Sequence, residues 1–314
     1  MTNPADVKQV RLRLGTRQSP LAVAQAEEAR ARLCAAHGWH RDEVELVKVV
    51  ASGDKIQDRP LAEIGGKALW TKELDQWLVE GRIDAAVHSM KDVETFRPDG
   101  FAIAAILPRA DRRDVLVGAE SVAAIPQGAT VGTSAPRRAA QMLNQRPDLK
   151  VVTFRGNVAT RLGKLEAGEA DVTLLAAAGL ERLGESGIGT PLEVCDWLPA
   201  PSQGAIGIEC LEANSLGFQA IAALDDEASR REVEHERALL RHLRGTCHSP
   251  IGVDCRSADG AMTMRAAIFS GDGCEMIEGE ARFPAIDEGG AAGLAQDLLS
   301  RASPKVKALF DGGA

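Results

Sequence analysis

The sequence predicts an α/β fold with largely parallel sheets over its first two thirds, followed by a smaller α+β unit. Three observations lead to this prediction. Short apolar runs typical of buried strands alternate with helical segments as far as about residue 210. Beyond that point a charged helical segment leads into alternating polar and apolar residues and then an Ala/Leu-rich helical segment. The length of 314 residues also suits two or three compact domains.

The segment up to about residue 108 is expected to hold four strands and two helices. Its strands are short apolar runs at Val10–Leu14, Val44–Val50, Asp84–His88 and Phe101–Leu107. The first helix, Pro20–Ala36, follows Ser19, a favourable N-cap residue. It begins with a proline, whose missing N–H costs nothing at the first helical position. The second helix is expected at Thr71–Glu80.

The same alternation continues through the middle of the chain and changes in the last third. Middle strands are expected at Asp114–Val117, Thr130–Gly132, Val151–Thr153, Asp171–Leu175 and Ala205–Cys210. Middle helices are expected at Pro136–Gln145 and Val158–Ala167. The last third is read as a charged helix at Ser229–Leu243, a strand at Met262–Phe269 and a helix near Ala291–Arg301. This change of pattern predicts a separate α+β unit.

Composition narrows the possible partners. The net charge of −8 and the few aromatic residues (seven Phe, four Trp, no Tyr) argue against a nucleic-acid surface, which needs positive charge and stacking platforms. The six cysteines and six histidines show no metal-ligand spacing, so no metal site is expected. No apolar run reaches the roughly 18 residues of a membrane helix, and the N-terminus lacks an apolar signal region. A cytoplasmic protein without membrane contact is expected.

Two segments of the sequence resemble each other, Leu14–Pro20 and Val131–Arg138. Each runs from a strand through Gly-Thr into a proline that begins a helix, and each carries arginine. A helix N-terminus offers free N–H groups and a partial positive charge, which suits an anion. Two ordinary capped turns are the alternative. Because both turns carry arginine, we favour paired anion sites on facing domains.

Positive charge is concentrated in one part of this acidic chain. Residues 133–164 contain seven basic residues against a single acid, Asp148. Arginine meets carboxylate or phosphate with two parallel hydrogen bonds and does not lose its proton. The chain has neither a GxxxxGK[ST] loop nor a GxGxxG motif, so nucleotide phosphates have no support. Carboxylates are therefore the favoured anions.

Two further segments carry candidate chemistry. In Val87–Val93 (VHSMKDV) a strand is followed by Ser89, Lys91 and Asp92, at the edge where open α/β sheets bind ligands. Lys91 would keep Asp92 ionised and ready to stabilise a cation, although a plain turn is the alternative. Cys247 lies on a Gly- and Pro-rich loop near Arg244 and His248. These neighbours could stabilise a thiolate, although an inert thiol is the favoured interpretation of the loop by itself.

These residues also carry a resemblance to a known family. The quoted stretches are TRQSPLA (16–22), GGK (65–67), VHSMKDV (87–93), GTS with RR (132–138), RGN with TRL (155–162) and QGAIGIE (203–209). In this order they are similar to hydroxymethylbilane synthase, also called porphobilinogen deaminase. The resemblance implies two α/β domains like those of periplasmic solute-binding proteins, hinged around a cleft, and a smaller α+β C-terminal domain. It places domain 1 at 1–108 and 203–222, domain 2 at 109–202 and domain 3 at 223–314.

The resemblance also implies the reaction and its residues. Four porphobilinogen molecules condense stepwise onto one covalently bound dipyrromethane cofactor per chain, ammonia is released, and hydrolysis frees 1-hydroxymethylbilane. Asp92 would be catalytic by stabilising the azafulvene cation left by ammonia loss, and Cys247 would hold the cofactor by a thioether. Cofactor binding is implied for Ser89, Lys91, Thr133, Ser134, Arg137, Arg138, Arg155 and Gly156. Substrate binding is implied for Arg17, Ser19, Gln25, Lys67, Arg155, Arg161, Arg182 and Gln203.

Cys247 is preferred to Cys255 as the cofactor-bearing residue because it fits the family's Gly…Pro-Ile-Gly frame. Several positions depart from the family's common pattern, namely Glu63, Trp70, Ala135, Pro136, Thr246, His248 and Ser249. Porphobilinogen and the growing polypyrrole are the expected partners, with no nucleic acid and no membrane, and a monomer is expected. Two other functions stay open at this point, a solute-binding or effector-sensing module and a nucleic-acid binder.

Overall fold

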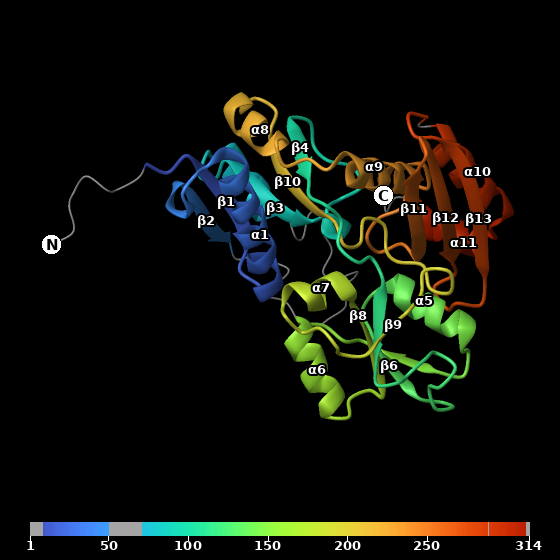
Figure 1. Ribbon diagram of the computed structural model, residues 1–314. Coiled ribbons are helices and arrows are strands. Elements are labelled where there is room, and N and C mark those ends of the chain that lie inside the picture. Colours follow the sequence, from blue (N-terminus) through green and yellow to red (C-terminus); the bar gives the residue numbers. More distant parts are fainter. Residues whose placement is uncertain (1–8, 50–70, 288, 312–314) are drawn as a thin grey trace.

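The computed structural model describes residues 9–49, 71–287 and 289–311, and its elements gather around three sheets (Figure 1). The first sheet and its helices form one unit, the second sheet lies below it in this view, and the third lies to the right. Separate hydrophobic clusters fill the interior of each unit. The predicted combination of two α/β units with a smaller α+β unit is confirmed.

The first sheet has the strand order β2-β1-β3-β10-β4. Its strands are Val44–Val49 (β2), Leu12–Arg17 (β1), Ala85–Ser89 (β3), Ile206–Leu211 (β10) and Phe101–Ile106 (β4). Only β10 runs against the others. The surrounding helices are Pro20–His37 (α1), Lys72–Val79 (α4) and Ser215–Ala222 (α8), with short 3₁₀ turns at Arg41–Glu43 (η2) and Met90–Asp92 (η3).

The second sheet repeats this arrangement in the order β7-β6-β8-β5-β9. Its strands are Lys150–Val152 (β7), Thr130–Gly132 (β6), Val172–Ala176 (β8), Asp114–Val117 (β5) and Thr190–Pro191 (β9). Here β5 is the reversed strand. The helices are Pro136–Gln145 (α5), Val158–Glu166 (α6) and Ala177–Arg182 (α7). The chain enters the second unit through β5 and returns to the first unit through β10. These two strands are the ones that run against the other strands of their sheets.

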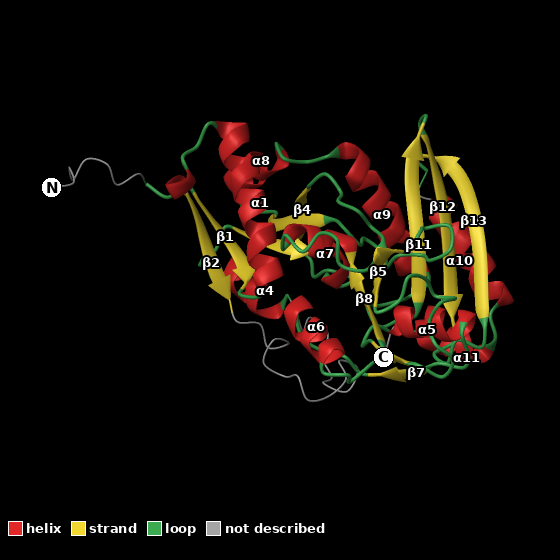
Figure 2. Cartoon of the chain, turned by 60° about the horizontal axis from the view of Figure 1, so that its bottom comes forward, coloured by secondary structure: helices red, strands yellow, loops and turns green. Residues whose placement is uncertain are grey.

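The third unit is an antiparallel sheet of three strands, packed against helices (Figure 2). The strands are Ile251–Ala258 (β11), Ala261–Phe269 (β12) and Met276–Pro284 (β13). The helices are Glu227–His242 (α9), Gly289–Arg301 (α10) and Pro304–Lys307 (α11), followed by the 3₁₀ turn Ala308–Phe310 (η4). One hydrophobic cluster joins α9 and α10 to this sheet. Helix α9 lies beside the first unit in both views.

Some sequence expectations need correction. The segments α7, α8, β9, β11 and β13 were not predicted; for example, the apolar run 174–180 divides between β8 and α7. His235 lies on the charged helix predicted at Ser229–Leu243, where a surface position is expected, but it is buried and forms a hydrogen bond with the Ala285 carbonyl. Free cysteines are usually buried as small hydrophobic residues, but Cys195 and Cys274 are exposed. The last residue of the predicted strand Val44–Val50 lies outside the described residues.

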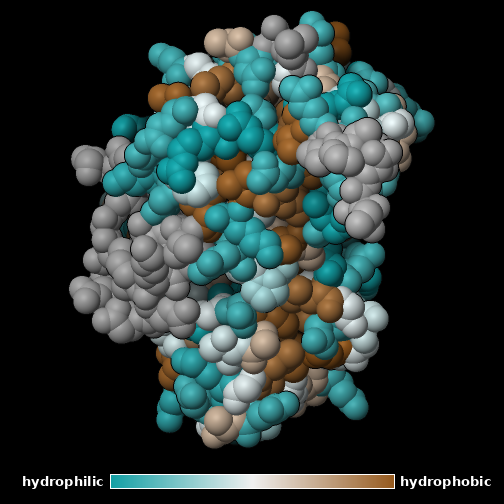
Figure 3. All heavy atoms as spheres, turned by 90° about the vertical axis from the view of Figure 1, so that its left-hand side faces the viewer, coloured by the Kyte–Doolittle hydropathy of each residue, from teal (hydrophilic) through white to brown (hydrophobic). Residues whose placement is uncertain are grey.

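The surface gives little sign of a broad apolar face on the side shown in Figure 3. Hydrophobic residues form groups there that hydrophilic residues separate, over the described part of that face. No helix among the described residues is long and apolar enough to span a bilayer.

Candidate functional site

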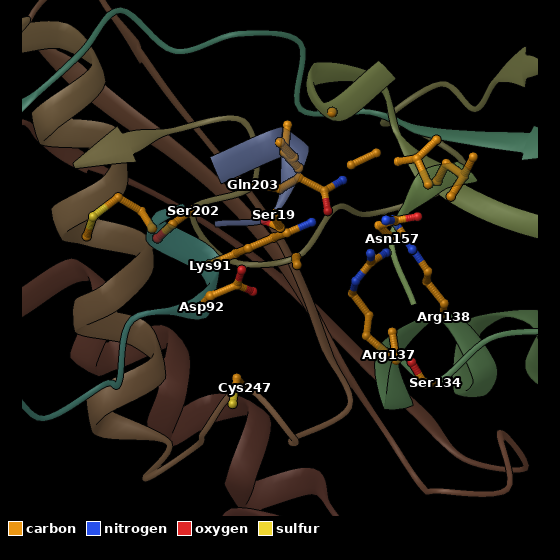
Figure 4. A pocket seen from close by; sticks show the side chains of 18 of the residues that line it. Ser19, Lys91, Asp92, Ser134, Arg137, Arg138, Asn157, Ser202, Gln203 and Cys247 are labelled. Atoms are coloured by element: carbon orange, nitrogen blue, oxygen red, sulfur yellow. The ribbon is translucent and has the colours of Figure 1, made fainter. Parts of the chain in front are cut away.

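A cavity with a volume of about 770 Å³ lies where the three units meet. Its wall is formed by the start of α1, the η3 turn, the starts of α5 and α6, the returning chain before β10, and the loop after α9. Figure 4 shows Lys91 and Asp92 on one side, Arg137 and Arg138 on the other, and Cys247 on a separate loop. The two similar segments found in the sequence therefore both reach one cavity.

Three helix N-termini contribute to the cavity wall. Helix α1 is capped by Ser19, which accepts a hydrogen bond from Ala22 N, and α6 is capped by Asn157, which accepts one from Thr160 N. Helix α5 begins after Ala135, and no side chain caps it. Its first N–H groups therefore remain available to a ligand, in accord with the expected anion site.

The Lys91–Asp92 pair lies directly after β3, in the η3 turn, and both residues line the cavity. Burial lowers the pKa of Lys91 to about 8, and the nearby Arg138 and Arg137 act in the same direction while Asp92 opposes them. Burial likewise lowers the pKa of Arg161 to about 10. Burial is the main cause of both lowered values, and repulsion from neighbouring arginines adds to it. An anionic ligand would relieve this repulsion.

Asp114 is a buried residue that the sequence reasoning missed as part of the site. It begins β5, its side chain is 0% exposed, and it pairs with Arg137 and Arg138 at 2.7 Å each. Trp197 Nε1 and Gln203 Nε2 each donate to it at 2.8 Å. Burial opposes its ionisation, but the two arginines outweigh burial and hold the pKa of Asp114 far below its usual range. An acid that begins a buried strand is the sequence signal that could have indicated a cationic partner.

Several buried polar atoms of cavity-lining residues lack a hydrogen-bond partner. They are Arg137 Nε, Arg138 Nε, Ser202 Oγ and Gln203 Oε1. Buried polar groups are usually satisfied, and leaving one unpaired costs about 1–3 kcal/mol. Asp114 binds a terminal nitrogen of each of the two guanidinium groups. The Nε–H groups of Arg137 and Arg138 therefore remain as hydrogen-bond donors without an acceptor. Such unmet donors fit a ligand that carries carboxylates.

Cys247 lines the cavity with an accessible side chain. The partly dry surroundings, together with Asp92 and Glu94, raise the pKa of the Cys247 thiol to about 11. Burial also lowers the pKa of His248, so its ring is mostly neutral near pH 7. The alternative of a stabilised thiolate is therefore not supported, because burial and the nearby carboxylates both disfavour the charged form. The loop is held by its own contacts, with Ser249 Oγ accepting from Thr246 N and donating to Leu309 O.

Most of the predicted site residues line the cavity. These are Arg17, Ser19, Lys91, Asp92, Ser134, Arg137, Arg138, Arg155, Gly156, Arg161, Gln203 and Cys247. Four others, Gln25, Ser89, Thr133 and Arg182, lie outside its lining. Gln25 Nε2 donates to Ser89 Oγ at 3.4 Å, Thr133 Oγ1 accepts from Ala135 N, and Arg182 pairs with Glu28 and donates to Gly204 O. Lys67 lies outside the described residues, as do Glu63 and Trp70.

Replacing Asp114 by asparagine should destabilise the protein strongly. The change leaves two buried arginines without a compensating charge, and breaking a buried pair in this way costs about 3–5 kcal/mol. Because the folded-state pKa of Asp114 is depressed, its contribution is fully present above the unfolded pKa of about 3.9 and is lost as pH falls toward the folded value. Urea unfolding should therefore give a difference between wild type and variant that is constant from pH 5 to 7 (about 3 kcal/mol or more) and shrinks in stronger acid.

The half-buried pair between Asp148 and Arg146, which unlike Asp114 is open to solvent, provides the matched control in the same unit. Asp148→Asn should cost far less stability, since solvent screens that pair. Equal losses for the two variants would contradict the role assigned to Asp114.

Comparisons with known proteins identify the family. A model of the porphobilinogen deaminase dipyrromethane cofactor-binding domain matches residues 12–216, and a model of the porphobilinogen deaminase C-terminal domain matches residues 230–301. The porphobilinogen deaminase of Sphingopyxis alaskensis is 53% identical over 305 residues, which cover 95% of this chain and 96% of the relative. That of Paracoccus denitrificans is 46% identical over 296 residues, covering 93% and 94%.

A solved structure, the BvgS VFT2 domain of Bordetella pertussis, is 15% identical with a TM-score of 0.41, over 72% of this chain and 91% of that one. Because the family is one of enzymes, the binding-only and nucleic-acid alternatives are not supported. With family models matched over most of its length and curated relatives near half identity, the chain belongs to the porphobilinogen deaminase family.

Proposed function

We propose that the cavity where the three units meet is the site at which this protein polymerises porphobilinogen, and that the residues predicted from the sequence do the work. One observation carries the proposal: Asp92 and Cys247 line the same cavity as a group of arginines that outnumber its acids. The activity itself, synthesis of a linear tetrapyrrole on a dipyrromethane cofactor, belongs to the family. The individual residue roles are our assignment.

The lining suits dipyrromethane, whose pyrrole rings carry acetate and propionate groups. Arg137, Arg138 and Ser202 offer buried atoms that lack partners, and Cys247 offers an accessible sulfur for a thioether. We assign cofactor binding to Cys247 and to the residues predicted for it, Ser89, Lys91, Thr133, Ser134, Arg137, Arg138, Arg155 and Gly156. When bound, the cofactor supplies the covalent end onto which pyrroles are added.

The protein's own groups have distinct tasks in this scheme. Arginine side chains fix the carboxylates of each porphobilinogen, because a guanidinium holds a carboxylate by two parallel bonds. Asp92 faces the substrate's reacting end and stabilises the cation left when ammonia departs, an effect worth several kcal/mol in a site with little water. Its carboxylate also accepts and returns the proton exchanged in each condensation. Substrate binding is assigned to Arg17, Ser19, Gln25, Lys67, Arg155, Arg161, Arg182 and Gln203.

We also propose the domain limits given by the sequence, with domain 1 at 1–108 and 203–222, domain 2 at 109–202 and domain 3 at 223–314. The strand orders support them, since β10 lies in the first sheet and β5 to β9 form the second. We propose that the protein works as a monomer.

A substitution of Arg161 tests carboxylate binding. Arg161 lines the cavity, and its Nε–H donates to Gly156 O, which leaves the rest of the guanidinium for a ligand. Loss of one charge-assisted bond, worth about 1.5–3 kcal/mol, predicts that Arg161→Leu lowers kcat/KM for porphobilinogen at least about tenfold. The measurement is steady-state release of ammonia, with four ammonia expected per tetrapyrrole in the wild type.

Arg146→Leu is the control, since Arg146 lies outside the cavity and pairs with Asp148. It should leave kcat/KM unchanged. An unchanged kcat/KM in the Arg161 variant would sink the assignment of that residue to substrate binding.

A further inference from the structure

Glu209 is a buried acid that the proposed reaction does not use. It lies on β10 in the middle of the first sheet, 0% exposed, and it is not part of the cavity lining. His88, within the motif VHSMKDV, and Arg97 are likewise absent from the lining. Ionised acids are rarely buried without partners, so the contacts of Glu209 show what it holds.

Both chain segments that flank the Asp92 turn are bound to this one carboxylate. On the entering side, His88 Nε2 lies 3.1 Å from Glu209 Oε2, and the ring must donate this bond because an ionised carboxylate only accepts. On the leaving side, Arg97 Nε donates to Oε1 and Arg97 Nη2 to Oε2, each at 2.8 Å. We name these three residues, His88, Glu209 and Arg97, the Glu209 clasp.

The electrostatics show that Glu209 stays ionised. Burial disfavours its charge, but the hydrogen bonds and charges of His88 and Arg97 outweigh burial and lower the pKa of Glu209 to about 2. Arg97 is also bound by Asp75 at 2.7 Å and by Glu94 at 2.6 Å. Burial opposes its charge, but Glu209 and Asp75 outweigh burial and raise the pKa of Arg97. Glu209 and Arg97 therefore stay charged throughout the neutral pH range.

The backbone around Glu209 is shaped for this contact. The register of β10 against β4 shifts between Ile208 and Glu209, and bulges of this kind redirect a side chain. His88 lies opposite Gly207 in the β3–β10 pairing, two residues along β10 from Glu209 and on the same face of the strand. A Cβ on Gly207 would collide with the Met90 sulfur, so glycine there lets the η3 turn pack against β10.

The η3 turn is tied to β10 by its backbone as well. Met90 N donates to Ala205 O at 3.1 Å, and Met90 is fully buried. The turn that presents Lys91 and Asp92 is thus held by β10 at its start, by Met90 inside it and by the clasp on both flanks. Each of these contacts restricts where the Asp92 carboxylate lies.

We propose that the Glu209 clasp positions Asp92 for catalysis: His88, Glu209 and Arg97 touch no substrate and act through the turn that carries the carboxylate. This inference rests on the proposed role of Asp92. Misplacement of a reacting group by about 1 Å can cost about 100-fold in rate. Because the arginines that bind carboxylates are untouched, loosening the clasp lowers kcat and leaves KM nearly unchanged.

Two substitutions of His88 test the proposal. His88→Leu removes the donor from the entering flank, whereas His88→Gln keeps an N–H donor of similar reach. We expect His88→Leu to lower kcat about tenfold with KM changed less than twofold, and His88→Gln to keep more than half of the wild-type kcat. Both enzymes are assayed on porphobilinogen as purified holoenzyme, with cofactor content measured by intact mass and kcat expressed per cofactor-bearing chain.

Asp84→Asn is the matched control, because it breaks a carboxylate–arginine pair at the opposite end of β3. Asp84 accepts from Arg13 Nη2 and from Arg13 N, both at 2.7 Å, and lies outside the cavity. This variant and His88→Leu are both expected to lower the melting temperature, but only His88→Leu should lower kcat. If the two variants lower kcat alike, the clasp has only a general structural role and the proposal is overturned.

Asp92→Asn in the same assay separates this proposal from the one on which it rests. An inactive Asp92 variant together with an unchanged kcat in His88→Leu overturns the positioning role alone. An Asp92 variant with near wild-type kcat overturns the proposed function of Asp92 and the clasp's role with it.

Discussion

Asp92→Asn should lose nearly all turnover of porphobilinogen while folding normally. The amide has the same shape as the carboxylate but carries no charge to stabilise the cation that forms when ammonia leaves. Removal of a single preorganised electrostatic group typically costs about 100- to 1000-fold in kcat, and Asp92 also has the proton-transfer role. We therefore expect a fall in kcat of at least about 1000-fold, measured by ammonia release in single-turnover experiments.

Glu185 offers a control in the same cavity. It is an acid that lines the cavity but follows α7, so it belongs to a different segment of the chain from the η3 turn. Glu185→Gln removes an equal charge and should leave kcat within about twofold of wild type, because no step of the proposed reaction uses this residue. If both variants lose activity equally, the cavity needs negative charge in general, and Asp92 has no special place in the reaction.

Cys247→Ser should yield a protein without covalent cofactor and without activity. Serine has nearly the same size, but its hydroxyl is a much weaker nucleophile than a thiol and forms no thioether. The sequence and the cavity lining agree on this residue, since Cys247 is accessible and Cys255 is fully buried in β11. Peptide mapping of digested wild-type protein should place the added mass on the peptide that contains Cys247.

Cys274→Ser serves as the control, because Cys274 is exposed and does not line the cavity. It should keep both cofactor and activity. A Cys247→Ser protein that still carries covalent cofactor would move the attachment to another residue and would contradict the assignment.

Local sequence patterns predicted much of the fold. Strands and helices with clear periodicity or capping signals, such as α1 after Ser19 and α5 at Pro136, begin where they were expected. The similarity between residues 14–20 and 131–138 correctly indicated that two βα turns share one cavity, because both follow a strand end. The family resemblance indicated the roles of individual residues. The spacing of residues alone was compatible with several different functions.

The features that escaped prediction all depend on contacts between distant parts of the chain. Asp114 and Arg138 are 24 residues apart, and Glu209 and His88 are 121 apart, so no local pattern links either pair. Strand β10 pairs with β3, but the whole second unit separates the two strands in the sequence. Glu209 is therefore next to β3 in space although it is far from β3 along the chain. The charge state of Cys247 escaped local patterns for the same reason, since Arg244 is close in sequence but burial, with Asp92 and Glu94, raises the pKa of the thiol.

The intact mass of freshly purified wild-type protein tests the central claim most directly. If the cavity holds a dipyrromethane bound to Cys247, the mass should exceed that of the chain by two linked pyrrole units. A limited addition of porphobilinogen should then produce further species, each heavier by one pyrrole unit, as rings are added before release. A protein that shows only the mass of its chain, yet forms tetrapyrrole from porphobilinogen, would contradict the account.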